Sequence, residues 1–431
     1  MSNLNKYLKG DIVIWIIFIV LCLISILEVY STSSSLAYRT DTTPTAIILG
    51  QIRFLVGGAA AVYILHLIPY KYVRILNYVL LGGIFVAILL ALTIGERRLF
   101  GIQPSEFAKV SVIMFVADML ARKQQKGTPD DAFKTIAWIV LPFCALIAPL
   151  KLSSALLIAA VTVFLMLIGR VSLKKIAVFA GILLLVGIPY IIIGFNFTEE
   201  QLRSNAATKV ISRAPTHAMR VGRMFVDKDK YYHFKDSKTK QPDSIKLIYR
   251  MKPHNETANI FGITTEMKNV DRRQATDALI AIAKAPAVIG MPGTSEQKHY
   301  LANAYDDYIF AIIVEENGVF AGIVVMLLYL FLLFRAGVIT RRSNQAFPTL
   351  LVVGLALLIA LQALVHIAVS ADAFITGETL PLISKGGSAI IATCGAFGLM
   401  LSISRYLNAE EDKEDKEIKT DTEEEALTIN N

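Results

Sequence analysis

The sequence predicts an all-α polytopic membrane protein with about ten transmembrane helices, both ends in the cytoplasm and one large extracytoplasmic loop. Of its 431 residues, 55% are hydrophobic and only 18% are charged, whereas a soluble domain carries about 25% charged residues. Uncharged runs close to the roughly 20 residues of a membrane span recur along the chain. Lys and Arg gather in alternate short connections, as they do on the cytoplasmic side of membrane proteins. The composition therefore excludes a cytosolic globular enzyme and a disordered chain.

Ten spans account for the apolar segments in chain order. The uncharged runs are residues 12–27, 75–95, 135–150, 152–169, 176–198, 317–334, 347–365 and 386–404. Two further stretches, 47–70 and 106–120, contain ionisable groups and complete the set. Because further spans follow the first run, we interpret it as an anchor and not as a cleaved signal peptide.

The basic connections follow the second, fourth, sixth and eighth spans, which places the N-terminus in the cytoplasm. Ten spans return the C-terminal segment 406–431 to the same side. Residues 410–431 contain ten Asp or Glu against three Lys, so we expect an acidic, disordered tail after a transmembrane domain at 1–405.

One connection is much longer than the others. We expect a large outer loop at about 197–306, between the seventh and eighth spans. Residues 197–300 contain eighteen Lys or Arg against eleven Asp or Glu, and an anionic ligand is one candidate explanation for this charge. The apolar stretch 278–290 is too short to span, which is typical of a re-entrant or interfacial segment.

Three cysteines, Cys22, Cys144 and Cys394, lie inside apolar runs. They give no sign of a disulfide, a zinc site or a redox pair. No metal-ligand cluster is predicted anywhere in the chain.

The segment 97–109 carries the first group of candidate site residues. Proline is favoured in the first turn of a helix, as Pro104 would be, and Glu106 suits the positive end of the helix dipole. Lys109 follows three residues later on the same face. With Arg97 and Arg98 these residues can bind a phosphate or diphosphate; the alternative is a basic loop end with an intrahelical ion pair.

The second group lies where the outer loop meets a membrane helix. Asp306 and Asp307 are adjacent, and Glu315 and Glu316 follow within the apolar stretch. If the helix begins near Asp307, Glu315 lies about 80° away around the helix and Glu316 points to the opposite side. A partly buried carboxylate has a raised pKa that suits a general base. A helix cap at Asp306 explains the spacing equally well.

Four ordered segments make the chain similar to one known family. Residues 103–109 read QPSEFAK, residues 307–311 read DYIFA with EENG at 315–318, residues 379–388 read TLPLISKGGS, and residues 402–405 read SISR. They resemble the QPSE-[LF]-AK, TDFIFA with EE-x-G, LPFVSYGGS and SISR motifs of the SEDS family (FtsW/RodA). The resemblance covers nearly the whole chain in the correct order.

The resemblance implies a peptidoglycan glycosyltransferase of the bacterial cytoplasmic (inner) membrane that polymerises lipid II at the outer face. Asp307 falls on the proposed catalytic base. The family's outer-loop arginines fall at Arg220 and Arg223, for which a solvated basic loop is the alternative. Arg97, Arg98, Glu106, Lys109, Arg220, Arg223, Glu315, Ser384 and Lys385 are the predicted substrate-binding residues.

The chain departs from the family pattern at two lysines. Lys151 stands where the family's PDLGTA motif has an acidic residue, so no catalytic role is carried onto it. Lys385 replaces the tyrosine of SYGGS. We treat both lysines as possible additional phosphate contacts.

The expected partners are lipid II, membrane lipid, a class B penicillin-binding protein transpeptidase and other divisome proteins, with no nucleic acid. No cofactor is required by the sequence, although a divalent cation (Mg or Mn) is an open possibility. The competing functions are a lipid II flippase and a scaffold that only recruits a partner. Residues 29–34, VYSTSS, favour the division type (FtsW) over the elongation type (RodA).

Overall fold

The computed structural model describes residues 9–205, 208–225, 254–260, 263–270, 273–301, 303–341, 343–373 and 377–429. The membrane helices among them are α2 (Ile12–Thr40), α3 (Pro44–Leu67), α4 (Tyr70–Ile94), α5 (Pro104–Lys126), α6 (Ala132–Ile147), α7 (Leu152–Ile168), α8 (Leu173–Asn196), α15 (Val319–Thr340), α16 (Ala346–Ser370) and α17 (Gly387–Ile429).

Each of the ten predicted spans corresponds to one of these helices, which confirms the predicted fold class. Among the described residues, seven helices are long and apolar enough to cross a membrane by length and composition. The other three are α7, which has 17 residues, α6, which has 16, and α5, which carries charged side chains at both ends. Pro104 occupies the first turn of α5, as the sequence predicts.

The core lies where α5, α7, α16 and the membrane part of α17 pack together. α16 packs against both α5 and α7, and α17 packs along α3. By contrast, only 11% of the apolar window of α8 is buried, so this helix faces lipid along most of its length. Asp118 of α5 pairs with Arg122 one turn later, and also with Arg74 of α4.

The long outer connection contains several short elements. They are α9 (Glu199–Ser204), η2 (Lys209–Ile211), α10 (Ala214–Arg223), β1 (His254–Ile260), β2 (Ile263–Val270), α13 (Arg273–Lys284), η3 (Gln297–His299) and α14 (Ile309–Asn317). β1 and β2 pair antiparallel as a hairpin that the sequence analysis did not predict. The apolar stretch 278–290 begins in α13, whose buried Ala278 and Ala281 face α14. Residues 226–253 of the predicted outer loop lie outside the described residues.

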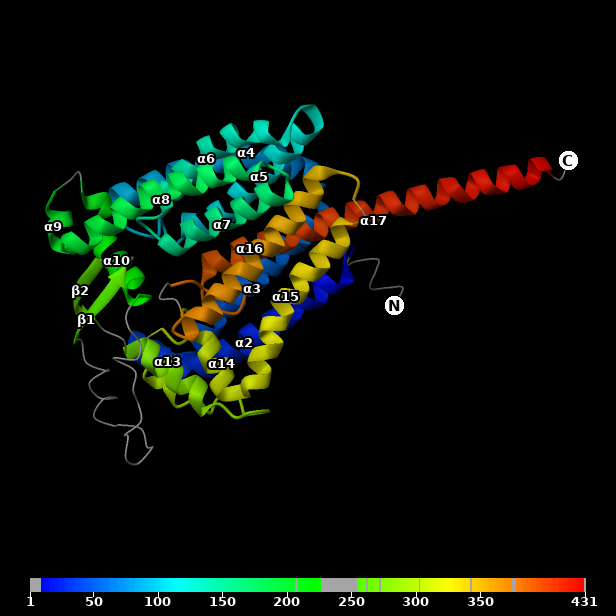
Figure 1. The fold of residues 1–431 in the computed structure, drawn as a ribbon. Coiled ribbons are helices and arrows are strands. Elements are labelled where there is room, and N and C mark those ends of the chain that lie inside the picture. Colours follow the sequence, from blue (N-terminus) through cyan, green and yellow to red (C-terminus); the bar gives the residue numbers. More distant parts are fainter. Residues whose placement is uncertain are drawn as a thin grey trace.

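Both chain ends lie at one end of the molecule in Figure 1, and α9, α10, α13 and the hairpin lie at the other. This arrangement agrees with ten spans that begin and end on the same side of a membrane. The predicted disordered tail differs from the structure, in which α17 continues as one helix to Ile429 and projects beyond the body (Figure 1). The Glu, Lys and Ala residues that dominate this stretch are strong helix formers.

Candidate functional site

A cavity of about 930 Å³ opens among the outer ends of the membrane helices. The N-terminal part of α3 and the loop before α5 form part of its wall, with Ile47, Phe54 and Phe100 as apolar lining. Five basic side chains line it, namely Arg97, Arg98, Lys151, Arg220 and Lys385. Three acidic side chains line it as well, namely Glu106, Asp306 and Asp307.

Three helices direct their N-terminal ends toward this cavity. Glu106 lies in the first turn of α5, Lys151 is the N-cap of α7, and Gly387 opens α17, and all three residues line the cavity. Helix N-termini carry partial positive charge and unpaired backbone N–H groups, which favour anions. The charge of the side chains and the dipoles of the helices therefore act in the same direction.

Asp307 lies at the junction of this cavity with a second one of about 270 Å³. Asn303 and Arg220 also line both cavities, and Arg223 lines the smaller one. Asn303 donates a side-chain hydrogen bond to the Asp307 carboxylate. A Cβ atom at Gly377 would lie 3.2 Å from each carboxylate oxygen of Asp307, so this position has room for glycine only while the carboxylate stays in place.

Asp306 and Asp307 are electrostatically coupled neighbours. Burial raises the pKa of Asp307, while Lys151 and Arg220 oppose the rise. Burial and the charge of Asp307 raise the pKa of Asp306 to about 7. Asp306 Oδ1 is buried and has no hydrogen-bond partner among the described residues, whereas Asn303 stabilises the ionised form of Asp307. Both carboxyls therefore titrate above the ordinary aspartate range, which suits a general base at this position.

The helix α14 begins two residues later than the sequence analysis supposed, at Ile309 with Tyr308 as its N-cap. The alternative of a helix cap at Asp306 is therefore wrong. Asp306 and Asp307 lie in the turn before the helix, and both carboxylates line the large cavity.

A buried cluster of two lysines and two glutamates lies beside the cavity. Lys109 Nζ lies 2.8 Å from Glu106 Oε2 and 2.7 Å from Glu378 Oε1. Lys151 Nζ lies 2.8 Å from Glu106 Oε1 and 3.1 Å from Glu378 Oε2. The predicted pairing of Glu106 with Lys109 is thus present, and Glu378, which the sequence analysis missed, completes the cluster. We refer to these four residues as the Lys–Glu tetrad.

Its place in the tetrad gives Lys109 a different role from the predicted one of binding substrate. Its side chain is 3% exposed, it does not line the cavity, and its third contact goes to Gln362 Oε1 at 2.8 Å. Lys109 therefore holds Glu106 and Glu378 in place and does not reach a ligand in the cavity. Lys151, which was given no catalytic role and was treated as a possible phosphate contact, does line the cavity.

The four arginines that the sequence analysis predicted for the site all line one or both of the cavities. Arg97 and Arg98 line the large cavity, and Arg97 Nε is buried without a hydrogen-bond partner among the described residues. Arg220 and Arg223 lie on α10, whose His217 accepts or donates a 2.7 Å hydrogen bond with the Tyr190 hydroxyl of α8. The backbone of Ala214 approaches Gly194 of α8 so closely that a Cβ there would lie 2.2 Å from the Ala214 oxygen. α8 thus carries the helix that presents Arg220.

Ser384 and Lys385 connect the start of α17 to the Asp306 segment. Ser384 Oγ donates to the Asp306 carbonyl at 2.8 Å, and the backbone N–H of Lys385 donates to the Tyr305 carbonyl at 3.0 Å. Ser384 does not line the cavity, so it positions Asp306 and does not bind substrate as the sequence analysis supposed. The Lys385 ammonium lies over the Tyr305 ring and lines the cavity, and burial lowers the pKa of this lysine.

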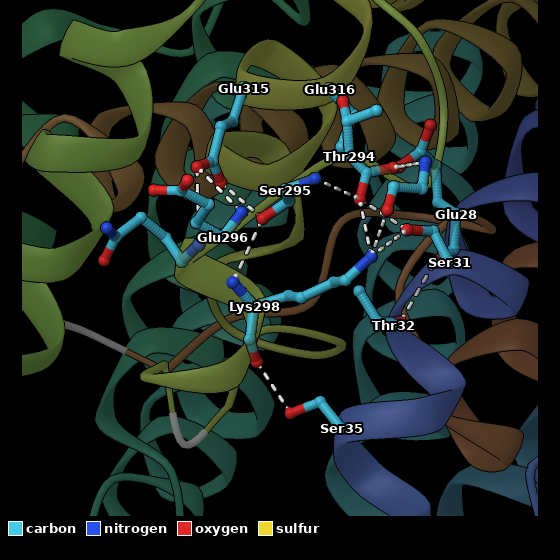
Figure 2. Close-up of polar contacts among 12 residues, drawn as sticks. Glu28, Ser31, Thr32, Ser35, Thr294, Ser295, Glu296, Lys298, Glu315 and Glu316 are labelled. Carbon is cyan, nitrogen blue, oxygen red and sulfur yellow. Dashed lines mark hydrogen bonds and ion pairs between the residues drawn. The ribbon is translucent and has the colours of Figure 1, made fainter.

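Glu315 lies in a separate polar cluster and lines neither cavity. Figure 2 shows Glu315 and Glu316 directed toward the segment around Ser295. Glu315 accepts hydrogen bonds from the Ser295 hydroxyl and from the backbone N–H groups of Glu296 and Gln297. The same segment also engages Glu316, which accepts hydrogen bonds from the backbone N–H groups of Gly293 and Ser295. Because α14 begins later than supposed, Glu315 fastens the outer loop and does not contact the cavity.

The described side chains around the cavity do not provide the donor set of a divalent cation. Among the residues that the structure describes, no group of three or more His, Cys, Asp or Glu side chains is arranged to hold a metal ion. Glu106 and Glu378 each contact two lysine ammonium groups, which occupy the carboxylate oxygens that a metal would need. The tetrad therefore does not fit a divalent cation.

The fold and the cavity define a polytopic membrane protein with a polar cavity, lined by more basic than acidic side chains, at its outer face. The family model for the FtsW/RodA/SpoVE cell cycle proteins matches residues 11–214 and 256–409. The chain belongs to this family, whose other name is SEDS, and so is a multi-pass protein of the bacterial cytoplasmic membrane.

Relatives and solved structures agree with this membership. The chain is 26% identical over 441 residues to the probable peptidoglycan glycosyltransferase FtsW of Bacillus subtilis (strain 168), covering 96% of this chain and 95% of that protein. It matches a peptidoglycan synthase complex with a TM-score of 0.62 at 19% identity, over 93% of this chain and 99% of that one. It matches the rod shape determining protein RodA of Thermus thermophilus with a TM-score of 0.57 at 17% identity, over 93% and 98% of the two chains.

Proposed function

We propose that this chain is a peptidoglycan glycosyltransferase that polymerises lipid II into β-1,4-linked glycan strands at the outer face of the cytoplasmic membrane. The observation that carries the proposal is the position of Asp307, a partly buried carboxylate at the junction of two cavities and within a ring of cations. Lipid II supplies what these cavities are suited to bind: a sugar head group, a diphosphate and a polyprenyl tail.

In this mechanism Asp307 is the general base. Its carboxylate takes the proton from the GlcNAc 4-hydroxyl of the acceptor, and the hydroxyl oxygen attacks the anomeric carbon of the donor MurNAc. The new C–O bond forms as the bond to the diphosphate oxygen breaks, so the electron pair leaves with the lipid diphosphate. Attack from the side opposite the leaving group inverts the anomeric centre.

The cavity assists the departure of the diphosphate. Arg97, Arg98 and Lys385 line it together with the N-terminal ends of α5, α7 and α17. Fixed charges directed at a site where negative charge develops stabilise the transition state more than the ground state. The buried Arg97 Nε that lacks a partner is one donor available for this contact.

Two cavities that share Asp307 suit a reaction with two sugar substrates. The larger one, with most of the cations, suits the donor and its diphosphate. The smaller one, lined by Thr216, Gln274 and Asn303, offers neutral polar groups that suit the acceptor sugar. Asp307 is then able to reach the hydroxyl of one substrate and face the anomeric carbon of the other.

The biological setting belongs to the same proposal. The identity to FtsW proteins along nearly the full chain supports a role in septal wall synthesis. The likeness to a chain of a peptidoglycan synthase complex supports a class B penicillin-binding protein as the partner that crosslinks the new glycan.

The test is reconstitution of the purified full chain with its transpeptidase and labelled lipid II in liposomes. Asp307→Asn should lower polymer formation by about 100-fold or more, since a general base contributes about 10² to 10⁴ in rate. Glu199→Gln, on the exposed outer helix α9, is the matched control and should polymerise normally. Full polymerisation by Asp307→Asn, or transbilayer movement of lipid II without polymer, would refute the proposal.

A further inference from the structure

Lys151 occupies the end of α7 that faces the cavity. It is the N-cap residue of that helix and lines the large cavity together with Asp306 and Asp307. The family motif at this position carries an acidic residue, so the charge here is inverted. A lysine beside the base and the leaving group changes the electrostatics of the reaction centre and calls for a physical explanation.

Two carboxylates fix the position of the Lys151 ammonium. Glu106 of α5 and Glu378 of the segment before α17 contact it at 2.8 and 3.1 Å. Glu378 accepts a 2.8 Å hydrogen bond from the hydroxyl of Ser153, which lies in the first turn of α7. An ammonium has three N–H donors, and these two carboxylates use two of them, which leaves one for the cavity that Lys151 lines.

Glu378 compensates for the inverted charge. With Lys109 and Lys151 facing Glu106 and Glu378, the tetrad contains equal numbers of positive and negative charges. Glu378 directly follows Gly377, where an added Cβ atom would lie 3.2 Å from the Asp307 carboxylate oxygens. The acidic group that the motif places on α7 is therefore supplied by the segment before α17, and Lys151 lines the cavity.

The same geometry disfavours a divalent cation at this position. Magnesium is bound in such sites through one or two carboxylates and the phosphates of the substrate. Here the carboxylates nearest to Lys151 are neutralised by ammonium groups, and the Lys151 charge repels a second cation in the same space.

We infer that Lys151 is the fixed cation that contacts the diphosphate of the polyprenyl donor, and that it replaces a divalent metal in this chain. Its free N–H donates to a diphosphate oxygen in the bound donor and keeps this contact as the sugar–oxygen bond breaks. The lysine stays charged throughout, so the step needs no additional proton transfer. This inference rests on the proposed function. It adds to that function the residue that contacts the diphosphate and the independence of the reaction from a divalent metal.

Farnesyl diphosphate provides a binding test that does not depend on turnover. The purified full chain should bind it in buffer with EDTA, and added Mg²⁺ or Mn²⁺ should not tighten binding. Lys151→Arg should keep most of the affinity. Lys151→Met together with Glu378→Gln leaves a neutral tetrad, so this double variant should fold and yet bind about 10- to 100-fold more weakly, as expected for loss of one charge-assisted hydrogen bond.

Lys175→Met is the matched control, because Lys175 lies on the cytoplasmic side and its loss should leave binding unchanged. Binding that appears only with Mg²⁺ or Mn²⁺, or wild-type affinity in the folded double variant, overturns the inference.

Polymer formation gives a second readout. Wild-type activity that persists in EDTA supports a metal-independent enzyme, whereas activity that EDTA abolishes and Mg²⁺ or Mn²⁺ restores overturns the inference but leaves the glycosyltransferase proposal intact. If no polymer forms under any condition, the proposed function fails. The farnesyl diphosphate measurement then still decides whether Lys151 is an anion-binding residue.

Discussion

Removing the Glu378 carboxylate tests whether the Lys–Glu tetrad is the electrostatic unit that its geometry indicates. Glu378 is fully buried and contacts Lys109 at 2.7 Å, Lys151 at 3.1 Å and Ser153 at 2.8 Å. Glu378→Gln leaves two buried ammonium groups with Glu106 as their only carboxylate. Loss of one partner from a buried ion pair costs about 3–5 kcal/mol, and we expect a decrease in unfolding free energy of this size.

A second substitution should reverse much of that loss. Lys109→Met combined with Glu378→Gln removes one charge of each sign and leaves the Lys151–Glu106 contact of 2.8 Å. Because a complete buried ion pair is often replaced by uncharged residues at little cost, the double variant should be more stable than either single variant.

The assay is equilibrium unfolding of the purified chain in mixed micelles, followed by intrinsic fluorescence. Arg203→Met, which breaks the exposed Arg203–Glu199 pair, is the control and should cost less than about 1 kcal/mol. The reasoning is refuted if Glu378→Gln costs no more than this control, or if the two single losses add in the double variant.

Three further predictions concern the site. Because burial raises the pKa of Asp307, polymerisation should decline on the acidic side at a pH above the ordinary aspartate value, and a decline that sets in only at the ordinary aspartate pKa would contradict the role of this buried carboxyl as the base. Gly377→Ala places a methyl group 3.2 Å from both Asp307 carboxylate oxygens, so kcat should fall while the thermal unfolding temperature changes little; a wild-type kcat would show that the carboxylate has room to move. Burial lowers the pKa of His217 to about 4, so the unfolded chain binds a proton here before the folded one and the docking of α10 should weaken as the pH falls from about 6.5 toward 4. The hydrogen-exchange protection factors of the α10 amides should fall over this range, and His217→Gln should abolish this pH dependence.

The fold could be predicted from the sequence because membrane spans have a local signal. An apolar run of spanning length identifies a helix without knowledge of its neighbours, and α5 could be placed despite its charges because Pro104 and Glu106 mark its start. The β1–β2 hairpin was missed because its residues, 254–260 and 263–270, are mostly polar and show no strong alternation.

The site was only partly predictable because its contacts join distant segments. The Glu106–Lys109 pair has a local i,i+3 signal, but Glu378 lies 269 residues from Lys109 and has no spacing relation to it. The unusual Lys151 was the available clue, since a lysine at the buried end of an apolar helix requires a carboxylate partner. For Glu315, helix periodicity predicted the angle of the side chain around the helix but not where the helix begins. In the folded chain the Glu315 carboxylate accepts hydrogen bonds from the segment around Ser295.

The attachment of α10 to α8 has a mechanical consequence. α8 faces lipid along most of its length, and the tilt of such a helix depends on the thickness of the surrounding hydrocarbon layer. Because α10 packs against α8, we expect a change in the tilt of α8 to displace α10 together with Arg220, which lines both cavities. The lipid composition of the surrounding bilayer is therefore expected to influence the geometry of the reaction centre.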